Sequence, residues 1–265
     1  MNPKARYILY LAFLLYRMRP RTQGPHRERR HMNRYDAVFF DIGGTLIHAC
    51  PDVASAFVGA ARKRGHEVSL PQVLPYMDEI DAYYEAEYLR DGDFWCSHER
   101  SRQIWIDMYT MLANFIGLED DASGISSDLY QAYLHADHWA IYPDVLNALR
   151  ALKRAGVRLG VISNWDASLE GLLRELMLLP YFDDVVASAA IGYRKPDHVV
   201  FELALERMGI EAARALHVGD LPEADGDGAT SAGMRPVIID RTGKHATCPY
   251  RRVTSLEELE GIVCA

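Results

Sequence analysis

Several residues able to do chemistry lie at the predicted ends of strands. Asp41 directly follows the apolar run YDAVFF, and Ser163 and Asp220 each end a further run of this kind. Short, mostly apolar runs are typical of strands buried on both faces of a parallel sheet. Because such sheets bind ligands at the carboxyl ends of their strands, two carboxylates and a hydroxyl are predicted to lie where a ligand would bind.

The segment Gly43-Gly44-Thr45 follows Asp41 and is predicted to form a turn. Glycine adopts backbone angles that other residues avoid, and successive amide N–H groups in such a turn can point toward one anion. An anionic group of a ligand could therefore dock beside the Asp41 carboxylate.

After Tyr142 the chain is predicted to alternate between helices and strands. Pro143 begins a first helix, and Gly156 ends it. The elements expected next are strand 157–163, helix 169–178, strand 184–188, helix 198–208, strand 215–220, helix 224–232 and strand 236–240. This alternation predicts an α/β fold, with a Rossmann-like parallel sheet core and helices on both of its faces.

Residues 53–138 instead show only helical patterns. Helices are expected over 53–64, 73–90 and 98–116, and the third carries apolar residues at three- and four-residue intervals along one stripe. We therefore predict an α/β core made of residues 32–49 and 140–265, interrupted by an all-α insertion over residues 50–139.

The 265-residue chain has a formal net charge of -8 that is unevenly distributed. Residues 1–31 hold eight Lys or Arg and one Glu, so residues 32–265 carry a net charge of -15. An acidic body disfavours nucleic acid, which proteins bind by neutralising phosphates with Lys and Arg, and it is compatible with a divalent cation. The four cysteines show no C-x-x-C spacing, so we expect reduced thiols and a cytoplasmic location.

The N-terminal extension, residues 1–31, combines an apolar run at 7–16 with a basic stretch at 17–30. Ten apolar residues are too few to span a bilayer as a helix, and we expect no membrane partner. A signal peptide, an interfacial anchor and a targeting segment are alternatives, although no small-residue cleavage site follows the run. Since Met32 directly precedes the predicted body, we expect the extension to lie outside the fold.

Four ordered motifs carry a resemblance to a known family. They are Asp41-Ile42-Gly43-Gly44-Thr45-Leu46, Ser163-Asn164, Lys195-Pro196-Asp197, and Gly219-Asp220 with Asp225 five residues on. Each string alone is a weak signal, but four in this order at strand ends are specific. Over residues 33–242 the set resembles the haloacid dehalogenase-like (HAD) hydrolase superfamily, and the helical insertion resembles the cap of its subfamily I.

The resemblance implies covalent attack on phosphorus. Asp41 would be the nucleophile and form an aspartyl-phosphate, which splits one difficult displacement into two easier steps. Ser163 and the backbone N–H of Asn164 would bind oxygens of the transferring group, and Lys195 would balance its charge. Taken singly, the same residues have ordinary alternatives: a turn-capping aspartate, a Ser-Asn helix cap and a solvated surface lysine.

The resemblance also implies a magnesium site and a small phosphorylated substrate, bound by a monomer or homodimer. Asp220 and Asp225 would supply oxygen ligands or hold metal-bound waters. Asp41 and the carbonyl of Gly43 would complete an octahedral, partly hydrated Mg²⁺ site. Asp227 lies two residues past the matching position, and we expect it to be exposed or to cap a helix.

Gly43 departs from the pattern of most phosphatases of this family, which carry a second aspartate there as general acid and base. Such proton transfer contributes on the order of 10²- to 10⁴-fold in rate. Three replacements are open: a good leaving group, a leaving group that needs no proton, such as halide, or a histidine of the insertion or its linkers. The histidines considered, which in such an insertion are more often partly exposed surface residues, are His48, His98, His135 and His138.

Two functions are alternatives to a Mg²⁺-dependent phosphohydrolase. A 2-haloacid dehalogenase-like enzyme would attack carbon without a metal, which the spacing of Asp220 and Asp225 disfavours. A non-catalytic protein would bind a phosphorylated ligand without turning it over. Substrate choice is expected from aromatic residues of the insertion, although such residues more often form a core: Tyr83, Tyr84, Tyr88, Phe94, Trp95 and Trp105.

Overall fold

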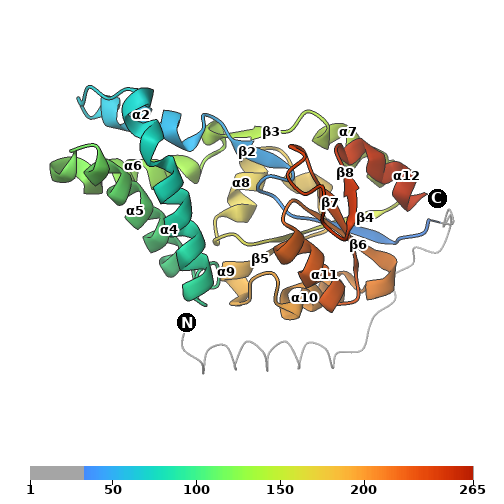
Figure 1. Cartoon of the computed structure of the whole chain (residues 1–265). Coiled ribbons are helices and arrows are strands. Elements are labelled where there is room, and N and C mark those ends of the chain that lie inside the picture. Colours follow the sequence, from blue (N-terminus) through green and yellow to red (C-terminus); the bar gives the residue numbers. More distant parts are fainter. Residues whose placement is uncertain (1–32, 265) are drawn as a thin grey trace.

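A six-stranded parallel sheet forms the centre of the fold (Figure 1). The computed structural model describes residues 33–264, so the extension 1–31 and Met32 lie outside the described residues. The strand order is β5-β4-β1-β6-β7-β8. The bounds are β1 Ala37–Phe40, β4 Arg158–Ser163, β5 Asp184–Ala187, β6 Ala215–Gly219, β7 Arg235–Ile239 and β8 Arg251–Val253. The predicted parallel α/β sheet is confirmed, and β8 is an edge strand that the prediction missed.

Helices cover both faces of this sheet. In β1, Val38 and Phe40 pack into one layer, and Ala37 and Phe39 pack into the other. Because successive side chains of a strand point to opposite faces, a strand covered on both sides is apolar throughout. The first layer contains α7 (Val145–Arg154), α8 (Leu169–Glu175) and α12 (Leu259–Val263), and the second contains α10 (His198–Met208) and α11 (Gly228–Ser231).

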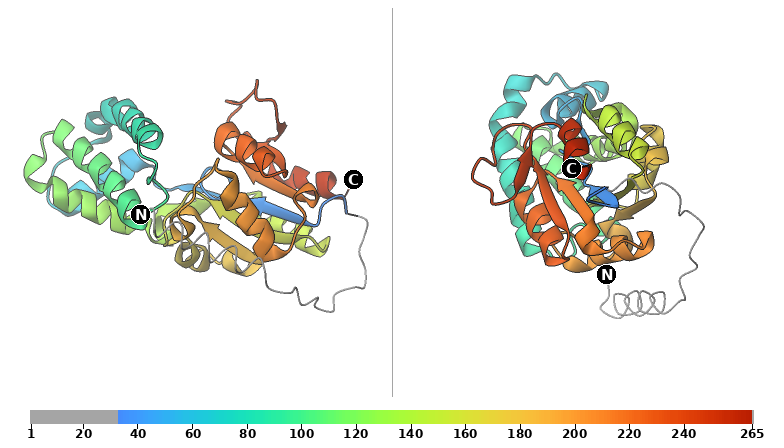
Figure 2. Two further views of the ribbon diagram at one scale, coloured as in Figure 1. Left: turned by 90° about the horizontal axis from the view of Figure 1, so that it is seen from below. Right: turned by 90° about the vertical axis from the view of Figure 1, so that its right-hand side faces the viewer.

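The helical segment, residues 53–138, lies beside the sheet and has a hydrophobic core of its own (Figures 1 and 2). Its helices are α2 Val53–Lys63, α3 Leu70–Val73, α4 Met77–Arg90, α5 His98–Phe115 and α6 Ala122–Tyr133. The helix expected to start at residue 73 starts at Met77, directly after the 3-10 turn Leu74–Tyr76, which contains Pro75.

A two-stranded antiparallel ribbon joins the helical segment to the sheet. It pairs β2 (Ile47–Ala49) with β3 (Trp139–Ile141), and Ile47 lies opposite Ile141. The chain therefore leaves and re-enters the α/β part through two adjacent strands, which the sequence patterns did not predict.

Short elements complete the described chain. They are η1 Leu74–Tyr76, η2 Glu119–Asp121, η3 Ala136–His138, η4 Leu179–Tyr181, α9 Ser188–Ile191, η5 Ala212–Arg214, η6 Pro222–Asp227 and η7 Leu256–Glu258. The helix predicted over 224–232 is instead the π-helical turn η6 followed by the single turn α11. Within residues 33–264, none of the helices has both the length and the apolar character needed to cross a bilayer.

Candidate active site

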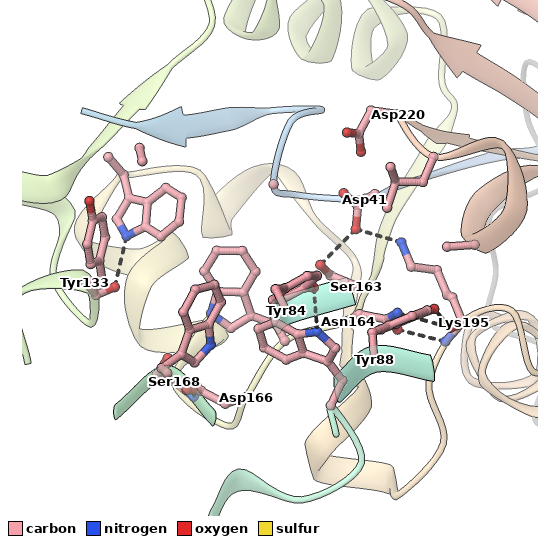
Figure 3. A pocket seen from close by; sticks show the side chains of 18 of the residues that line it. Asp41, Tyr84, Tyr88, Tyr133, Ser163, Asn164, Asp166, Ser168, Lys195 and Asp220 are labelled. Carbon is pink, nitrogen blue, oxygen red and sulfur yellow. Dashed lines mark hydrogen bonds and ion pairs between the residues drawn. The ribbon is translucent and has the colours of Figure 1, made fainter. Parts of the chain in front are cut away.

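The register of the sheet brings the predicted strand-end residues together. Phe40 of β1 lies level with Val161 of β4 and with Val218 of β6. Asp41 and Ser163 therefore leave adjacent strands at the same edge, and the hydroxyl of Ser163 donates a 2.9 Å hydrogen bond to Oδ1 of Asp41. Figure 3 shows Asp41 between the side chains of Ser163 and Lys195.

Lys195, in the loop between α9 and α10, reaches the same carboxylate. Its ammonium donates to Oδ1 of Asp41 at 2.6 Å and to Oδ1 of Asp225 at 2.6 Å, and the residue is only 2% exposed. Burial opposes the charge of this ammonium, but the carboxylates of Asp225 and Asp41 outweigh burial and raise the pKa of Lys195. The lysine is therefore a buried, permanently charged group and not a solvated surface residue.

Asn164 holds the backbone on which Lys195 sits. Its side-chain nitrogen donates to the carbonyl of Lys195 at 3.1 Å, and its side-chain oxygen accepts from the amide of Lys195 at 2.7 Å. The predicted group of Asp41, Ser163, Asn164 and Lys195 is thus brought together. The positioning role of the Asn164 side chain was not predicted, because it depends on a segment some thirty residues away.

Asp225 is held entirely by protein donors. Its Oδ1 accepts from Lys195 and, at 2.8 Å, from Nε2 of His217, and its Oδ2 accepts from the backbone N–H of Leu221 at 3.0 Å. Burial acts to raise the pKa of Asp225, but Lys195 and His217 lower it below the ordinary value. Gly219 makes room for this carboxylate, since a Cβ at that position would lie 2.0 Å from Cγ of Asp225.

The prediction that Asp225 belongs to a metal site with Asp41 and Asp220 stays a prediction, and in the described structure its oxygens accept from protein donors. Among residues 33–264, no three His, Cys, Asp or Glu side chains converge in a way that could hold a metal ion. His217 was missed by the sequence analysis because it lies in an apolar strand and has no distinctive spacing. It is fully buried, and burial lowers the pKa of its imidazole.

Asp220 differs from Asp225 because no Lys, Arg or His among residues 33–264 forms an ion pair with it. Within the described part of the chain, its side chain accepts a single, long hydrogen bond of 3.5 Å from the hydroxyl of Thr45. Burial, followed by the charges of Asp41 and Asp225, raises the pKa of Asp220 to about 8. A carboxylate next to other carboxylates and short of positive charge suits a divalent cation, and Mg²⁺ in proteins commonly uses one or two carboxylates plus water.

A backbone hydrogen bond closes the turn after Asp41. The amide of Gly44 donates to the carbonyl of Ile47 at 2.9 Å, so it does not point at a ligand. Of the three turn residues, Gly43 lines the cavity at this site, whereas Gly44 and Thr45 do not. The substrate-binding role predicted for Gly44 and Thr45 therefore stays a prediction, because neither residue lines the cavity in the described structure. Gly44 is needed for space, because its φ is +71° and a Cβ would lie 2.4 Å from Oδ2 of Asp220.

Replacing Gly44 by Ala is expected to displace the Asp220 carboxylate. An alanine in the left-handed backbone conformation lowers the free energy of unfolding by about 1–2 kcal/mol. The clash of its Cβ with Asp220 should in addition move that carboxylate. Gly65→Ala is the matched control, because Gly65 has φ +92° and nothing within 4 Å of the added Cβ. We expect Mg²⁺ to raise the Tm of the wild type and of Gly65→Ala, but not of Gly44→Ala. An equal Mg²⁺ response in both variants would contradict this role of Gly44.

A cavity of about 330 Å³ opens between the sheet edge and the helical segment. Asp41, Ser163, Asn164, Lys195 and Asp220 line one end of it (Figure 3). Aromatic side chains of the helical segment and its linkers line much of the remainder. Of the six aromatics predicted to influence substrate choice, Tyr84, Tyr88, Trp95 and Trp105 line the cavity, whereas Tyr83 and Phe94 do not.

None of the four histidines considered as general acid lines this cavity. Nδ1 of His48 lies 3.1 Å from the carbonyl of Ala49, and His135 pairs with an exposed glutamate at 3.2 Å. His138 packs edge-on against Tyr133, and His98 is half-exposed. The structure therefore gives no support to a histidine in the place of the missing acid.

Comparison with known proteins agrees with this geometry. The family model described as haloacid dehalogenase-like hydrolase matches residues 35–233. The chain is 32% identical over 216 residues to "haloacid dehalogenase-like hydrolase domain-containing protein 3" of Homo sapiens, covering 80% of this chain and 84% of that protein. It is 33% identical over 211 residues to a glyceraldehyde 3-phosphate phosphatase of Methanothermobacter thermautotrophicus, covering 77% and 85% of the two chains.

A solved structure shows the same similarity. The 2-haloacid dehalogenase of Pseudomonas syringae is 26% identical, with a TM-score of 0.58, and the match covers 86% of this chain and 97% of that one. The family match spans most of the chain, and it includes all four motifs. The protein is therefore a hydrolase, and it belongs to the haloacid dehalogenase-like hydrolase family.

Proposed function

We propose that this hydrolase is a Mg²⁺-dependent phosphohydrolase that acts on a small phosphorylated molecule through an aspartyl-phosphate on Asp41. The observation that carries the proposal is the position of Asp41. Both side-chain hydrogen bonds that it accepts within the described chain, from Ser163 and Lys195, go to Oδ1. Its Oδ2 is thus the oxygen left to attack phosphorus at the end of the cavity.

The neighbouring groups suit the charge that develops in such an attack. Oδ2 of Asp41 forms a bond to phosphorus as the bond from phosphorus to the leaving oxygen breaks. The hydroxyl of Ser163 and the ammonium of Lys195 are placed to donate to the phosphoryl oxygens, and Lys195 stays charged throughout. Water then attacks the aspartyl-phosphate, which releases inorganic phosphate and regenerates Asp41.

The residues present fit a magnesium ion held by Asp41, Asp220 and the carbonyl of Gly43. When bound, Mg²⁺ would supply positive charge between the carboxylates and the phosphoryl oxygens. Asp225 would contribute indirectly, because it holds the ammonium of Lys195 toward Asp41.

We further propose that residues 50–139 form a helical cap of the subfamily I type over a core of residues 32–49 and 140–265. The separate hydrophobic core of the helical segment supports this division. Contacts close to the site also join the two parts. The hydroxyl of Tyr88 donates to the carbonyl of Lys195 at 3.0 Å, and the guanidinium of Arg194 lies 4.1 Å from the centre of the Tyr88 ring. The cap would therefore complete the site and select the substrate.

The names of the relatives support phosphate chemistry without assigning a substrate. One relative is a glyceraldehyde 3-phosphate phosphatase, whereas a matching solved structure is a 2-haloacid dehalogenase. The crowded, cation-poor carboxylate of Asp220 favours the metal-dependent reaction, since attack on carbon needs no metal. We also propose a cytoplasmic location, since the spacing of the four cysteines along the sequence is not that of a disulfide framework.

A panel of phosphorylated metabolites and 2-haloacids, each with Mg²⁺ or with EDTA, tests the proposal. We expect phosphate release that requires Mg²⁺ and no halide release. Halide release that persists in EDTA would favour the dehalogenase. A rise in Tm with beryllium fluoride and Mg²⁺, with no turnover of any substrate, would favour a non-catalytic binding protein.

Gly43→Asp is expected to accelerate the hydrolysis of alkyl phosphates. A Cβ added at Gly43 would lie 3.5 Å from the Trp165 ring, which is an ordinary van der Waals distance, so a side chain fits there. A carboxyl group there could protonate an alkoxide leaving group, which contributes on the order of 10²-fold or more. The asparagine of Gly43→Asn has nearly the same shape as the aspartate of Gly43→Asp but cannot transfer the proton. Gly43→Asn should therefore not increase the rate of hydrolysis. Steady-state phosphate release measures the rates of both variants. Equal rates for Gly43→Asp and Gly43→Asn would show that proton transfer to the leaving group does not limit the rate.

A further inference from the structure

Six aromatic side chains follow one another around the cavity in a closed succession. The succession, which we name the aromatic belt, runs through Trp95, Trp105, Tyr109, Tyr133, Trp139 and Trp165 and back to Trp95. Neighbouring ring centroids lie 5.1–6.5 Å apart. All six residues line the cavity. The part of the cavity away from Asp41 is therefore bounded by π-faces and ring edges.

Hydrogen bonds hold two rings of the belt in place. The indole N–H of Trp139 donates to the carbonyl of Tyr133 at 2.9 Å, and that of Trp95 donates to the hydroxyl of Tyr84 at 3.0 Å. Because these donors are already used, the two rings offer mainly apolar surface to a ligand. Rings held in place in this way bind a planar apolar group at little entropic cost.

The cavity lacks groups that would recognise a second anion. No Arg or His of the described chain lines it, and its one lysine, Lys195, is paired with Asp41 and Asp225. Apart from the carboxylates at the end that holds Asp41, the cavity is lined by one further carboxylate of the described chain, Asp166. Its oxygens accept from the amide of Ser168 at 2.7 Å and from a tyrosine hydroxyl at 3.2 Å. A substrate with a second phosphate or a carboxylate would find no free cation among the described residues that line the cavity, and it would lie near the Asp166 carboxylate.

The leaving group must also depart without a carboxylic acid at position 43. The ring of Trp165, a member of the belt, lies against that position. A phenol has a pKa near that of the tyrosine side chain, about 10, whereas water and simple alcohols lie near 16. A phenolate therefore leaves as an anion far more readily than an alkoxide, and it carries the ring that the belt can stack.

We propose that the substrate is an aryl phosphate whose aromatic ring lies within the belt and which carries no second anionic group. The inference rests on the proposed phosphohydrolase activity and names its substrate class. As Oδ2 of Asp41 bonds to phosphorus, the bond from phosphorus to the aryl oxygen breaks. Its electron pair leaves with the phenolate, which takes its proton from water.

Binding of non-hydrolysable phosphonates tests the recognition step. Benzylphosphonate and cyclohexylmethylphosphonate have the same charge and similar size, so they differ mainly in the aromatic ring. By calorimetry with Mg²⁺ present, we expect benzylphosphonate to bind about tenfold more tightly. Equal affinities, or tighter binding of 2-(trimethylammonio)ethylphosphonate, would overturn the aryl inference and leave the phosphohydrolase standing. If neither these phosphonates nor inorganic phosphate binds, the phosphohydrolase itself is wrong.

Variants of the belt give a second test. Trp105→Leu should weaken benzylphosphonate binding by about three- to tenfold and leave inorganic phosphate binding unchanged. Trp105→Phe should bind benzylphosphonate more tightly than Trp105→Leu, because it keeps an aromatic ring. The comparison therefore distinguishes the loss of the ring from a loss of the fold. Tyr76→Leu is the control, because Tyr76 stacks on Phe115 in the helical segment but does not line the cavity. Equal weakening by Trp105→Leu and Tyr76→Leu would contradict the belt as the binding surface.

Turnover completes the test. The wild type should hydrolyse phenyl phosphate with a kcat/KM about 10²-fold or more above that for cyclohexyl phosphate, and Gly43→Asp should narrow this ratio because the alkoxide gains a proton donor. A ratio near one in the wild type would overturn the inference, although phosphate-ester hydrolysis as such would be upheld.

Discussion

Replacing Asp41 by Asn is expected to lower phosphate release by at least about 10⁴-fold, because the amide cannot form the covalent intermediate. Asn has nearly the same shape and keeps an oxygen for the hydrogen bonds from Ser163 and Lys195. Burial is the main cause that raises the pKa of Asp41 above its ordinary value. An uncharged side chain there should therefore leave the fold intact or raise its Tm.

The control for this variant is Asp227→Asn. Asp227 is exposed, as expected from the sequence, and it does not line the cavity, although it accepts a hydrogen bond from Tyr250. Its replacement should change phosphate release less than about twofold. Quenching the reaction with acid in the presence of a substrate labelled in its phosphate should trap a labelled phosphoenzyme from the wild type and from Asp227→Asn. It should trap none from Asp41→Asn. Unchanged turnover in Asp41→Asn would exclude the aspartyl-phosphate.

Lys195→Met is expected to give the largest loss of stability. It leaves the carboxylates of Asp41 and Asp225 buried without their shared cation. Removing one partner of a buried ion pair lowers the free energy of unfolding by about 3–5 kcal/mol. In a protein of this size each kcal/mol corresponds to about 2–4 °C, so the Tm should fall by roughly 6–20 °C.

The matched control is Lys153→Met. Lys153 donates to Asp183 at 2.9 Å, but about a third of each side chain is exposed. Such surface pairs contribute at most about 1 kcal/mol, so the Tm should fall by no more than a few degrees. Similar losses in both variants would contradict a special role for the buried pair.

The stability deficit of Lys195→Met should also depend on pH. In the wild type, Lys195 and His217 lower the pKa of Asp225, so this carboxylate stabilises the fold above its unfolded pKa of 3.8 and loses that contribution at lower pH. Without the lysine, the pKa values of the buried carboxylates in the fold should rise above their unfolded values. The variant should then gain stability relative to the wild type as the pH falls from 8 to 5, which thermal melts can measure.

The α/β sheet and the convergence of Asp41, Ser163 and Asp220 could be predicted from the sequence. Apolar runs that end in a polar residue define both a buried strand and its carboxyl end. In a parallel sheet these ends meet at one edge, so local patterns alone place residues far apart in the chain at one site. The motif at Lys195 can also be recognised in the sequence, but the burial of this lysine and its two carboxylate partners cannot be predicted from it.

Other features depended on contacts between segments that no local pattern relates. Asp225 carries the spacing of a metal ligand, yet its oxygens are occupied by Lys195, His217 and a backbone amide. Gly44 resembles an anion-binding glycine, yet it is required because the Asp220 carboxylate lies against it.

The aromatic belt shows the same limit. Trp95 and Trp165 are seventy residues apart, yet their ring centroids lie 6.5 Å from each other. The sequence by itself determined the sheet, the order of its strands along the chain and the chemistry at their ends, because these follow from local polarity and periodicity. The tertiary structure alone decided which donors occupy each carboxylate and which rings enclose the cavity, because those choices depend on how the helical segment and the sheet pack together.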